Sequence, residues 1–257
     1  MKAIILAGGL GSRLSEETHF KPKPMVEIGG KPILWHIMKI YSFYGIKDFI
    51  ICCGYKKNLI EQYFSNFSFN TLNVNFTSKK NIVKVKKKKK DNWNITLVDT
   101  GKNTMTGGRL KRVENFIKEK EVFCFTYGDG LADINISNLI SFHKKHGNEA
   151  TITIVNPTSK FGFVDISKNN LVKNFNEKPR LNKNWINGGF FVLNKSVLKR
   201  IIGDQSVWEQ RPLKSLVMDK QLIAYKHRGF WKCMDTLKDK NELNELWNSN
   251  KASWKKW

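Results

Sequence analysis

The stretch Leu6-Ala7-Gly8-Gly9-Leu10-Gly11-Ser12-Arg13-Leu14 decides the fold, and the apolar run Ala3-Ile4-Ile5-Leu6 leads into it. A strand that ends in a glycine-rich turn leaves backbone N–H groups free to point at an anion. Glycine has no Cβ, so phosphate oxygens can come close to the backbone. Arg13 adds a permanently charged guanidinium, and Lys23, stiffened by Pro22 and Pro24, adds a compact ammonium. The pattern predicts a phosphate-binding loop at the end of the first strand.

This loop departs from two common phosphate-binding motifs. The chain contains no string of Gly, four residues and then Gly-Lys-Ser/Thr. The dinucleotide pattern G-x-G-x-x-G/A fails because Leu14 stands where its third small residue belongs. Taken alone, the loop is also compatible with a plain strand-to-helix turn. The class of phosphate ligand therefore has to be inferred from the rest of the chain.

Apolar runs and helical periodicities alternate along the first half of the chain. The run Phe49-Ile50-Ile51-Cys52-Cys53 is apolar throughout, as in parallel strands that are buried on both faces. We predict strands over 2–6, 49–53, 72–77, 95–98 and 122–126, helices over 33–44, 59–64, 108–117 and 136–146, and a polar insertion loop over 78–94. This alternation predicts an α/β fold with a Rossmann-like doubly wound sheet, mixed but mostly parallel.

Strand patterns dominate the second half. We predict strands over 150–155, 161–166, 171–176, 189–193 and 221–225, and helices over 195–202, 210–219 and 238–247. No internal repeat and no clear linker is found, so residues 1–257 are interpreted as a single domain with a smaller β-rich portion.

The composition limits the partners and the compartment. The formal net charge is +23, and the run Lys84-Val85-Lys86-Lys87-Lys88-Lys89-Lys90 is its densest part. A basic field attracts nucleotides and sugar phosphates as well as nucleic acids. No aromatic residues alternate with these lysines, so we favour a solvated loop over a nucleic-acid surface. No apolar run reaches the roughly 18 residues of a membrane span, and the four cysteines form no C-x-x-C pair, so we expect reduced thiols in a cytoplasmic protein without membrane contact.

Asp129 is the strongest candidate ligand for a metal. It follows the apolar strand predicted over 122–126 and lies between Gly128 and Gly130, at the end of the sheet where ligands bind in open α/β folds. Mg²⁺ prefers one or two carboxylates together with phosphate oxygens and water. A simple Gly-Asp-Gly turn explains the spacing equally well. Asp133 is interpreted as a cap or turn residue, and His36, in an apolar helix, as a core histidine.

Several strings along almost the whole chain resemble the sugar-1-phosphate nucleotidyltransferases, and most closely those members that join CTP to glucose 1-phosphate. The resemblance is carried by Gly8–Leu14, Pro22–Met25, Met25–Met38, Ile50–Lys56, Thr96–Gly101, Met105–Arg112, Thr126–Gly130, Ile186–Phe191 and Met234–Thr236. It implies CTP and glucose 1-phosphate as substrates, Mg²⁺ as cofactor, CDP-glucose and pyrophosphate as products, and a role in making precursors of deoxysugars and O-antigen polysaccharide. It also implies a homo-oligomer, a nucleotide-binding half up to about residue 133 and a sugar-phosphate-binding half beyond it.

The resemblance assigns roles to individual residues. Lys23, Arg13 and Asp129 are implied as catalytic, and Asp129 and Asp235 as metal ligands, although Asp235 also suits the N-cap of the last helix. The implied nucleotide-binding residues are Leu6, Ala7, Gly8, Gly9, Gly11, Ser12, Arg13, Lys23, Thr106, Gly107 and Arg109. The implied sugar-phosphate residues are Glu177, Lys178, Asn187 and Gly188. Lys21 is the competing candidate for the role of Lys23, and Thr106 also suits a helix cap.

Several departures and two alternatives accompany this resemblance. Ser12 replaces the more usual threonine. Two strings differ from the common R-F-G-A-L-D and W-Q-P-M forms: Phe161-Gly162-Phe163-Val164-Asp165 and Trp231-Lys232-Cys233-Met234. One alternative is a sister enzyme that uses UTP, dTTP or GTP. The other is an inactive basic relative that binds nucleic acid, against which Arg13, Lys23, Asp129 and Asp235 argue because all four are present.

Overall fold

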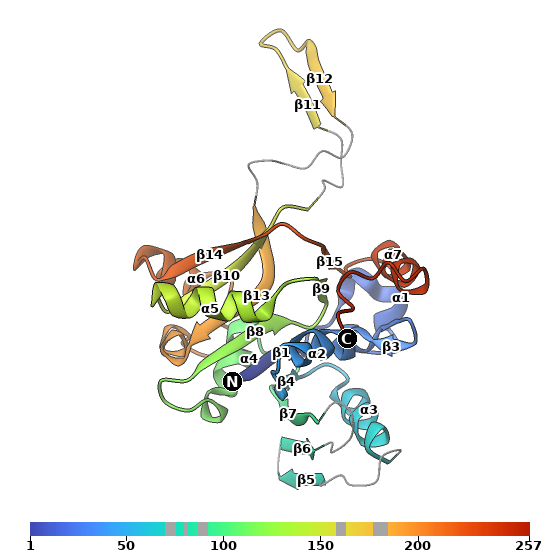
Figure 1. The fold of residues 1–257 in the computed structure, drawn as a ribbon, viewed down its shortest axis with the longest axis vertical. Coiled ribbons are helices and arrows are strands. Elements are labelled where there is room, and N and C mark those ends of the chain that lie inside the picture. Colours follow the sequence, from blue (N-terminus) through green and yellow to red (C-terminus); the bar gives the residue numbers. More distant parts are fainter. Residues whose placement is uncertain (70–75, 80–81, 87–91, 158–162, 177–184) are drawn as a thin grey trace.

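The computed structural model describes residues 1–69, 76–79, 82–86, 92–157, 163–176 and 185–257, and its centre is one large twisted sheet (Figure 1). Within the described residues this sheet has nine strands in the order β14-β10-β13-β8-β1-β4-β7-β6-β5. The strands are β1 Lys2–Ala7, β4 Asp48–Cys53, β5 Phe76–Lys79, β6 Ile82–Lys86, β7 Asn94–Asp99, β8 Val122–Tyr127, β10 Ala150–Val155, β13 Ile186–Asn194 and β14 Leu222–His227. β6 and β13 run opposite to the other strands, so the predicted mixed, mostly parallel α/β sheet is confirmed.

Helices and small strand pairs surround this sheet (Figure 1). The helices are α1 Ser15–Thr18, α2 Ile33–Phe43, α3 Lys57–Phe69, α4 Thr106–Arg112, α5 Ile136–His146, α6 Arg211–Met218 and α7 Leu237–Asn248. Shorter 3₁₀ turns are η1 Ser12–Leu14, η2 Lys23–Met25, η3 Glu114–Phe116 and η4 Lys195–Arg200. The small pairs are β2 Glu27–Ile28 with β3 Lys31–Pro32, β9 Gly130–Ala132 with β15 Trp231–Cys233, and β11 Phe163–Ile166 with β12 Val172–Asn176.

Side chains on the two faces of the sheet pack into two separate apolar cores. Ile5 of β1 belongs to the core that contains α2, whereas Ile4 belongs to the core that contains Leu110 of α4. Cys53 and Cys52 divide in the same way, which confirms that these neighbours point to opposite faces. β4 and β8 lie on opposite sides of β1 in the sheet, so the order of the strands reverses direction at β1.

The segment 78–94 is the clearest difference from the prediction. We expected an insertion loop, but β6 lies within it and pairs antiparallel with β7, with Val83 opposite Leu97. Val83 packs against the core while Lys84 is exposed, so the lysines alternate with apolar side chains that the sheet covers. The lysine-rich composition hid a strand that pairs with the next strand along the chain. Most of the run Lys86–Lys90 and part of the strand expected over 72–77 lie outside the described residues.

Smaller differences concern ends and types of elements. The helix expected over 108–117 is α4 followed by η3, and the helix expected over 195–202 is the 3₁₀ turn η4. The pairs β2–β3 and β9–β15 were not predicted, because strands of two or three residues carry no periodicity. Asp133 caps no helix: its carboxylate lies 3.1 Å from Nε2 of His227, and the cap of α5 is Asn135. In the part of the chain that is described, no helix combines the length and apolar character that crossing a bilayer requires.

His36 is a core histidine, as predicted. It is fully buried in α2, and one ring nitrogen lies 2.8 Å from the carbonyl oxygen of Ile28. Burial lowers the pKa of His36 from 6.5 to about 4, even though the hydrogen bond to Ile28 acts in the other direction. The imidazole is therefore neutral in the folded protein at neutral pH.

This neutral histidine predicts a loss of stability in mild acid. Between the two pKa values of 6.5 and about 4, the unfolded chain binds a proton that the folded chain does not, so stability falls as the pH falls through this window. At 1.36 kcal/mol per unit, the loss approaches about 3 kcal/mol. Urea unfolding of the wild type and of His36→Gln from pH 7 to pH 4 measures it, because the variant lacks this titration. Parallel pH profiles for the two proteins would contradict the assignment.

Candidate active site

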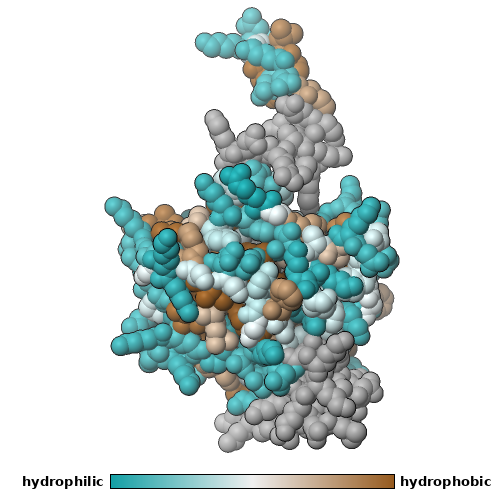
Figure 2. All heavy atoms as spheres, in the orientation of Figure 1, coloured by the Kyte–Doolittle hydropathy of each residue, from teal (hydrophilic) through white to brown (hydrophobic). Residues whose placement is uncertain are grey.

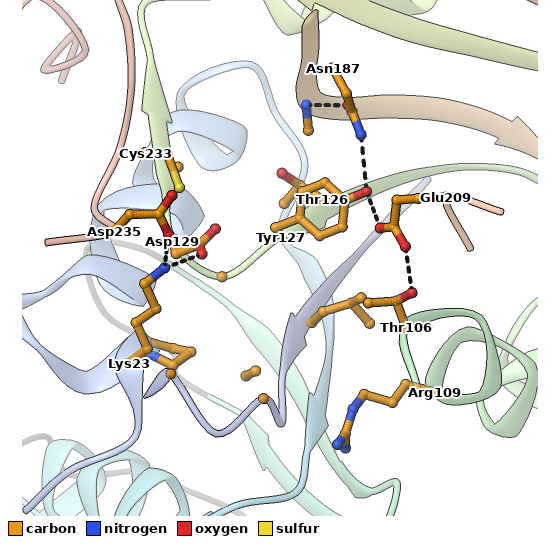
Figure 3. Close-up of a pocket in the computed structure, with 18 of the residues that line it drawn as sticks. Lys23, Thr106, Arg109, Thr126, Tyr127, Asp129, Asn187, Glu209, Cys233 and Asp235 are labelled. Carbon is orange, nitrogen blue, oxygen red and sulfur yellow. Dashed lines mark hydrogen bonds and ion pairs between the residues drawn. The ribbon is translucent and has the colours of Figure 1, made fainter. Parts of the chain in front are cut away.

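A pocket of about 590 Å³ lies at the carboxyl ends of β1 and β8, where open α/β sheets bind ligands (Figure 3). The glycine-rich loop that follows β1 forms one wall. Of the predicted nucleotide-binding residues, the pocket is lined by Leu6, Ala7, Gly9, Gly11, Ser12, Arg13, Lys23, Thr106 and Arg109. The volume suits a ligand with the size of a nucleotide.

The loop is held in shape by Thr18. Gly11 has a φ of +70°, which side chains rarely adopt, and a Cβ on it would meet the methyl group of Thr18 at 2.7 Å. The hydroxyl of Thr18 donates to the carbonyl oxygens of Gly11 and Leu14, at 3.0 and 2.9 Å. Gly9, by contrast, has open space where a Cβ would lie. A glycine at this position therefore leaves room for a ligand.

Lys23 lies between two carboxylates in the pocket (Figure 3). Its Nζ is 2.6 Å from Asp129 and 2.7 Å from Asp235, and its side chain is only 10% exposed. Burial alone lowers the pKa of Lys23, but the charge of Asp129 and the hydrogen bonds to Asp129 and Asp235 outweigh burial and raise it. Arg13, at the exposed rim, donates to Asp235 at 2.9 Å. The structure thus brings together all four charged residues that the sequence singled out.

Asp235 reaches the pocket because β15, near the end of the chain, pairs with β9. β15 pairs with β9, with Cys233 opposite Gly130, and the backbone N–H of Met234 donates to the carbonyl of Asp129 at 2.9 Å. Helix α7 is capped by Thr236 in a capping box with Asp239, so Asp235 is not the N-cap. Lys21, the competing candidate for Lys23, pairs instead with Glu27 at 3.3 Å.

Arg109 makes hydrogen bonds that the sequence did not predict. Its buried guanidinium donates to the carbonyl oxygens of Cys53, Gly101, Gly8 and Lys102 and to the hydroxyl of Thr100, at 2.7–3.3 Å. These hydrogen bonds tie the ends of β1, β4 and β7 together, and they leave the guanidinium committed to the protein itself. Arg109 also lines the pocket, so its predicted contact with base, ribose or phosphate stays a prediction, while these hydrogen bonds favour a role in supporting the loop.

This arrangement also explains Gly8, which the sequence assigned to ligand approach. A Cβ on Gly8 would lie 2.1 Å from the guanidinium of Arg109, and one on Gly54 would lie 2.4 Å from it. Gly107 likewise faces the protein, because its Cβ would meet the carbonyl oxygen of Ser206 at 2.7 Å. The missing side chains at Gly8 and Gly107 thus make room for packing within the protein.

The opposite wall of the pocket carries a hydrogen-bonded chain that sequence reasoning missed (Figure 3). The hydroxyl of Tyr127 donates to Glu209 and accepts from Nδ2 of Asn187 at 3.1 Å. Thr106 donates to the other oxygen of Glu209 at 2.7 Å and accepts from the backbone N–H of Trp208 at 2.9 Å. Thr106 is thus no helix cap, since α4 has Met105 there. The chain links α4, β8 and β13 across the pocket.

The predicted sugar-phosphate residues divide into two groups. Asn187 and Gly188 line the pocket, and the carbonyl oxygen of Gly188 accepts from the indole N–H of Trp231 at 2.7 Å. Glu177 and Lys178 lie outside the described residues. Tyr127 carried a signal in the sequence, since it directly precedes Gly128-Asp129-Gly130. Cys233 lies in the string that departs from W-Q-P-M, whereas Glu209 carried no signal.

The residues present suit a divalent cation. Asp129, Cys233 and Asp235 each offer one ligand atom, and these three atoms lie within 4.8 Å of one another. The two carboxylates supply the hard oxygen donors that Mg²⁺ and similar ions prefer. The ammonium of Lys23, seated between the two carboxylates, marks where their negative charge converges.

Comparison with known families agrees with this geometry. Residues 2–236 match the family model described as nucleotidyl transferase. The chain belongs to the nucleotidyl transferase family. The glucose-1-phosphate cytidylyltransferase of Salmonella typhi is 56% identical over 257 residues, which cover both chains completely. A probable glucose-1-phosphate cytidylyltransferase of Bacillus subtilis is 42% identical over 258 residues, again along the full length of both. The family resemblance that the sequence motifs indicated is confirmed.

Solved structures support the fold. HddC from Yersinia pseudotuberculosis superposes with a TM-score of 0.70 at 22% identity, covering 96% of this chain and 99% of its own. A UDP-glucose pyrophosphorylase in complex with UDP-glucose gives 0.68 at 18% identity, covering 97% and 98%. At such identities the likeness concerns the architecture alone.

Proposed function

We propose that this chain transfers the cytidylyl group of CTP to glucose 1-phosphate, giving CDP-glucose and pyrophosphate. The observation that carries this function is the convergence of the glycine-rich loop, Arg13, Lys23 and the pair Asp129–Asp235 on one pocket. The full-length identity of 56% to a cytidylyltransferase supports the choice of substrates. Synthesis of CDP-glucose for deoxysugars of surface polysaccharides is the wider role that we propose.

The reaction needs positioning and charge neutralisation more than a protein nucleophile. A phosphate oxygen of glucose 1-phosphate forms a bond to the α-phosphorus of CTP, and the bond from that phosphorus to the β-phosphate bridging oxygen breaks as pyrophosphate leaves in line. The loop around Gly9 and Ser12 and the guanidinium of Arg13 hold the triphosphate. Lys23 places its ammonium against the charge that develops on the transferred group. Asn187 and the backbone of Gly188 face the sugar.

Asp129 and Asp235 would hold the divalent ion, for which we propose Mg²⁺. When bound, the ion supplies charge neutralisation to the phosphate oxygens. Because Lys23 contacts the same two carboxylates, its ammonium is free to shift toward the phosphates once a cation takes over that contact.

Pyrophosphate release with each of four nucleoside triphosphates, glucose 1-phosphate and Mg²⁺ tests the function. We expect CTP to exceed UTP, dTTP and GTP clearly in kcat/KM. A preference for another nucleotide would favour a sister enzyme. Absence of release with all four, together with a salt-dependent gel shift on nucleic acid, would overturn the enzymatic assignment.

The hydroxyl of Tyr127 is expected to affect sugar binding, because it orients Asn187 toward the pocket. Removing one such hydrogen bond costs about 0.5–1.5 kcal/mol, so Tyr127→Phe should raise KM for glucose 1-phosphate several-fold while kcat changes little. Steady-state kinetics with each substrate varied in turn measure this, with Tyr225→Phe on β14, away from the pocket lining, as the matched control. A rise in KM for CTP alone would place the hydroxyl on the nucleotide side.

We also infer a homo-oligomer, supported by the hairpin β11–β12. Figure 1 shows this hairpin beyond one end of the main body, and Figure 2 shows hydrophobic side chains on it. Five apolar residues there are 50–70% exposed: Val164, Ile166, Leu171, Val172 and Phe175. An isolated two-stranded hairpin is only marginally stable, so a second copy of the chain is the partner we propose.

Light scattering after size-exclusion chromatography tests this oligomer. Leu171→Ser combined with Phe175→Ser is expected to lower the molar mass to that of one chain, since about 1.5–3 kcal/mol is lost with each large side chain removed from an interface. A wild-type mass of one chain at micromolar concentration would contradict the inference. We propose a cytoplasmic location, in keeping with the four unpaired cysteines.

A further inference from the structure

Cys233 places a thiol beside the two carboxylates of the pocket (Figure 3). The pairing of β15 with β9 sets Cys233 opposite Gly130, next to Asp129, and Asp235 follows two residues later. The ligand atoms of these three side chains lie within 4.8 Å of one another. The sequence departs here from the W-Q-P-M form, so the thiol is a feature of this chain that the proposed function does not use.

The other three cysteines have no comparable position. Cys52, Cys53 and Cys124 are 0–1% exposed and lie within the sheet, between the two cores. Cys233 is partly exposed and lines the pocket. All four cysteines lie in the described residues, so Cys233 is the one thiol that a solvated ion in the pocket can reach.

A thiolate changes the choice of metal. Carboxylate oxygens suit hard ions such as Mg²⁺, whereas thiolate sulfur suits Zn²⁺ and other soft ions, and Zn²⁺ also binds most sites more tightly than the earlier divalent metals. We propose that Asp129, Cys233 and Asp235 form a mixed thiolate–carboxylate site that binds Zn²⁺ more tightly than Mg²⁺, and that Zn²⁺ bound there inhibits the transferase. The inhibition rests on the proposed function, but the binding does not.

The distances allow this coordination. A tetrahedral Zn²⁺ with its usual bonds to oxygen and sulfur keeps neighbouring ligand atoms about 3.3–3.6 Å apart. The three ligand atoms lie within 4.8 Å of one another, which is close to this spacing. Binding releases the thiol proton to solvent as the zinc–sulfur bond forms. The ammonium of Lys23 has to withdraw, since it occupies the space between the same carboxylates.

Cadmium absorbance tests the site without substrates. Titration of the metal-free protein with Cd²⁺, a spectroscopic substitute for Zn²⁺, should produce a thiolate-to-metal charge-transfer band that saturates at one ion per chain. The band should persist in Cys124→Ala and disappear in Cys233→Ser. Competition with a chromogenic chelator should show at least about 100-fold weaker Zn²⁺ binding in Cys233→Ser, because even the outer partners of metal ligands contribute 10–100-fold.

A second readout needs no variant. Zn²⁺ should protect Cys233 of the wild type from iodoacetamide, as mapped by peptide mass spectrometry, whereas Mg²⁺ at the same concentration should not. Absence of the cadmium band, its persistence in Cys233→Ser, or unprotected alkylation with Zn²⁺ would each overturn the site. If the cadmium band appears and Zn²⁺ protects Cys233, but the protein releases no pyrophosphate, the metal site is supported. The proposed function is then refuted instead.

Discussion

Replacing Lys23 by alanine is expected to lower kcat by about 10²–10³, the usual effect of removing one donor that stabilises charge in a transition state. KM for both substrates should change only a few-fold, because Arg13 and the loop around Gly9 still hold the triphosphate. The change also leaves Asp129 and Asp235 facing each other without the ammonium that now lies 2.6 and 2.7 Å from them. Initial rates of pyrophosphate release at saturating substrates measure the effect.

Lys21→Ala is the matched control for this experiment. Lys21 lies two residues away on the same segment, but its ammonium pairs with exposed Glu27 at 3.3 Å. Such surface pairs contribute about 0–1 kcal/mol, so both kcat and thermal stability should stay near the wild-type values. An unchanged kcat in Lys23→Ala, in a protein that still unfolds cooperatively, would remove Lys23 from the mechanism.

The parts of the fold that the sequence predicted well are those with local signals. The apolar run over 49–53 identified β4, and the spacing in 136–146 matched α5 at both ends. β6 was missed because its lysines resemble a loop, and only pairing with β7 makes its alternation meaningful. Whether a lysine-rich segment pairs with its neighbouring strand or stays a loop is decided by packing, which the residue pattern of that segment does not contain.

The same distinction applies to the site. Lys23, Asp129 and Asp235 carried recognisable strings, and the structure brings them together. Glu209 carried no string, since it reaches the pocket only because the segment before α6 packs on α4. Arg109 shows what the sequence could not predict: its residue type and its place near glycines suggest phosphate binding, but the hydrogen bonds of its guanidinium go to the ends of three strands. A motif predicts which residue types gather, and packing decides which way each one points.

A substitution of Arg109 would test whether its guanidinium supports the protein backbone. Arg109→Met removes the donor to the carbonyl oxygens of Gly101 and Lys102, and each unsatisfied buried group costs about 1–3 kcal/mol. The carbonyl oxygens of Gly8 and Cys53 keep the backbone N–H groups of Tyr55 and Thr100 as donors. Because two acceptors lose their donor and the hydrogen bonds that tie together the ends of β1, β4 and β7 are lost, we expect the largest loss of stability of any variant considered, about 3–5 kcal/mol after partial relaxation. Arg109→Lys should recover only part of it, because a single ammonium cannot serve acceptors spread around a planar fork.

Urea unfolding of Arg109→Met, Arg109→Lys and Arg112→Met measures this contribution. Arg112 lies three residues after Arg109, at the end of α4. Its side chain is 42% exposed and pairs with Asp204 at the surface, so Arg112→Met should lower the free energy of unfolding by less than about 1 kcal/mol. If Arg109 instead bound the nucleotide, Arg109→Met would raise KM for CTP and leave the unfolding midpoint unchanged. A lower midpoint with a proportionate loss of active protein is expected, because the guanidinium holds the glycine-rich loop in the shape that the triphosphate requires.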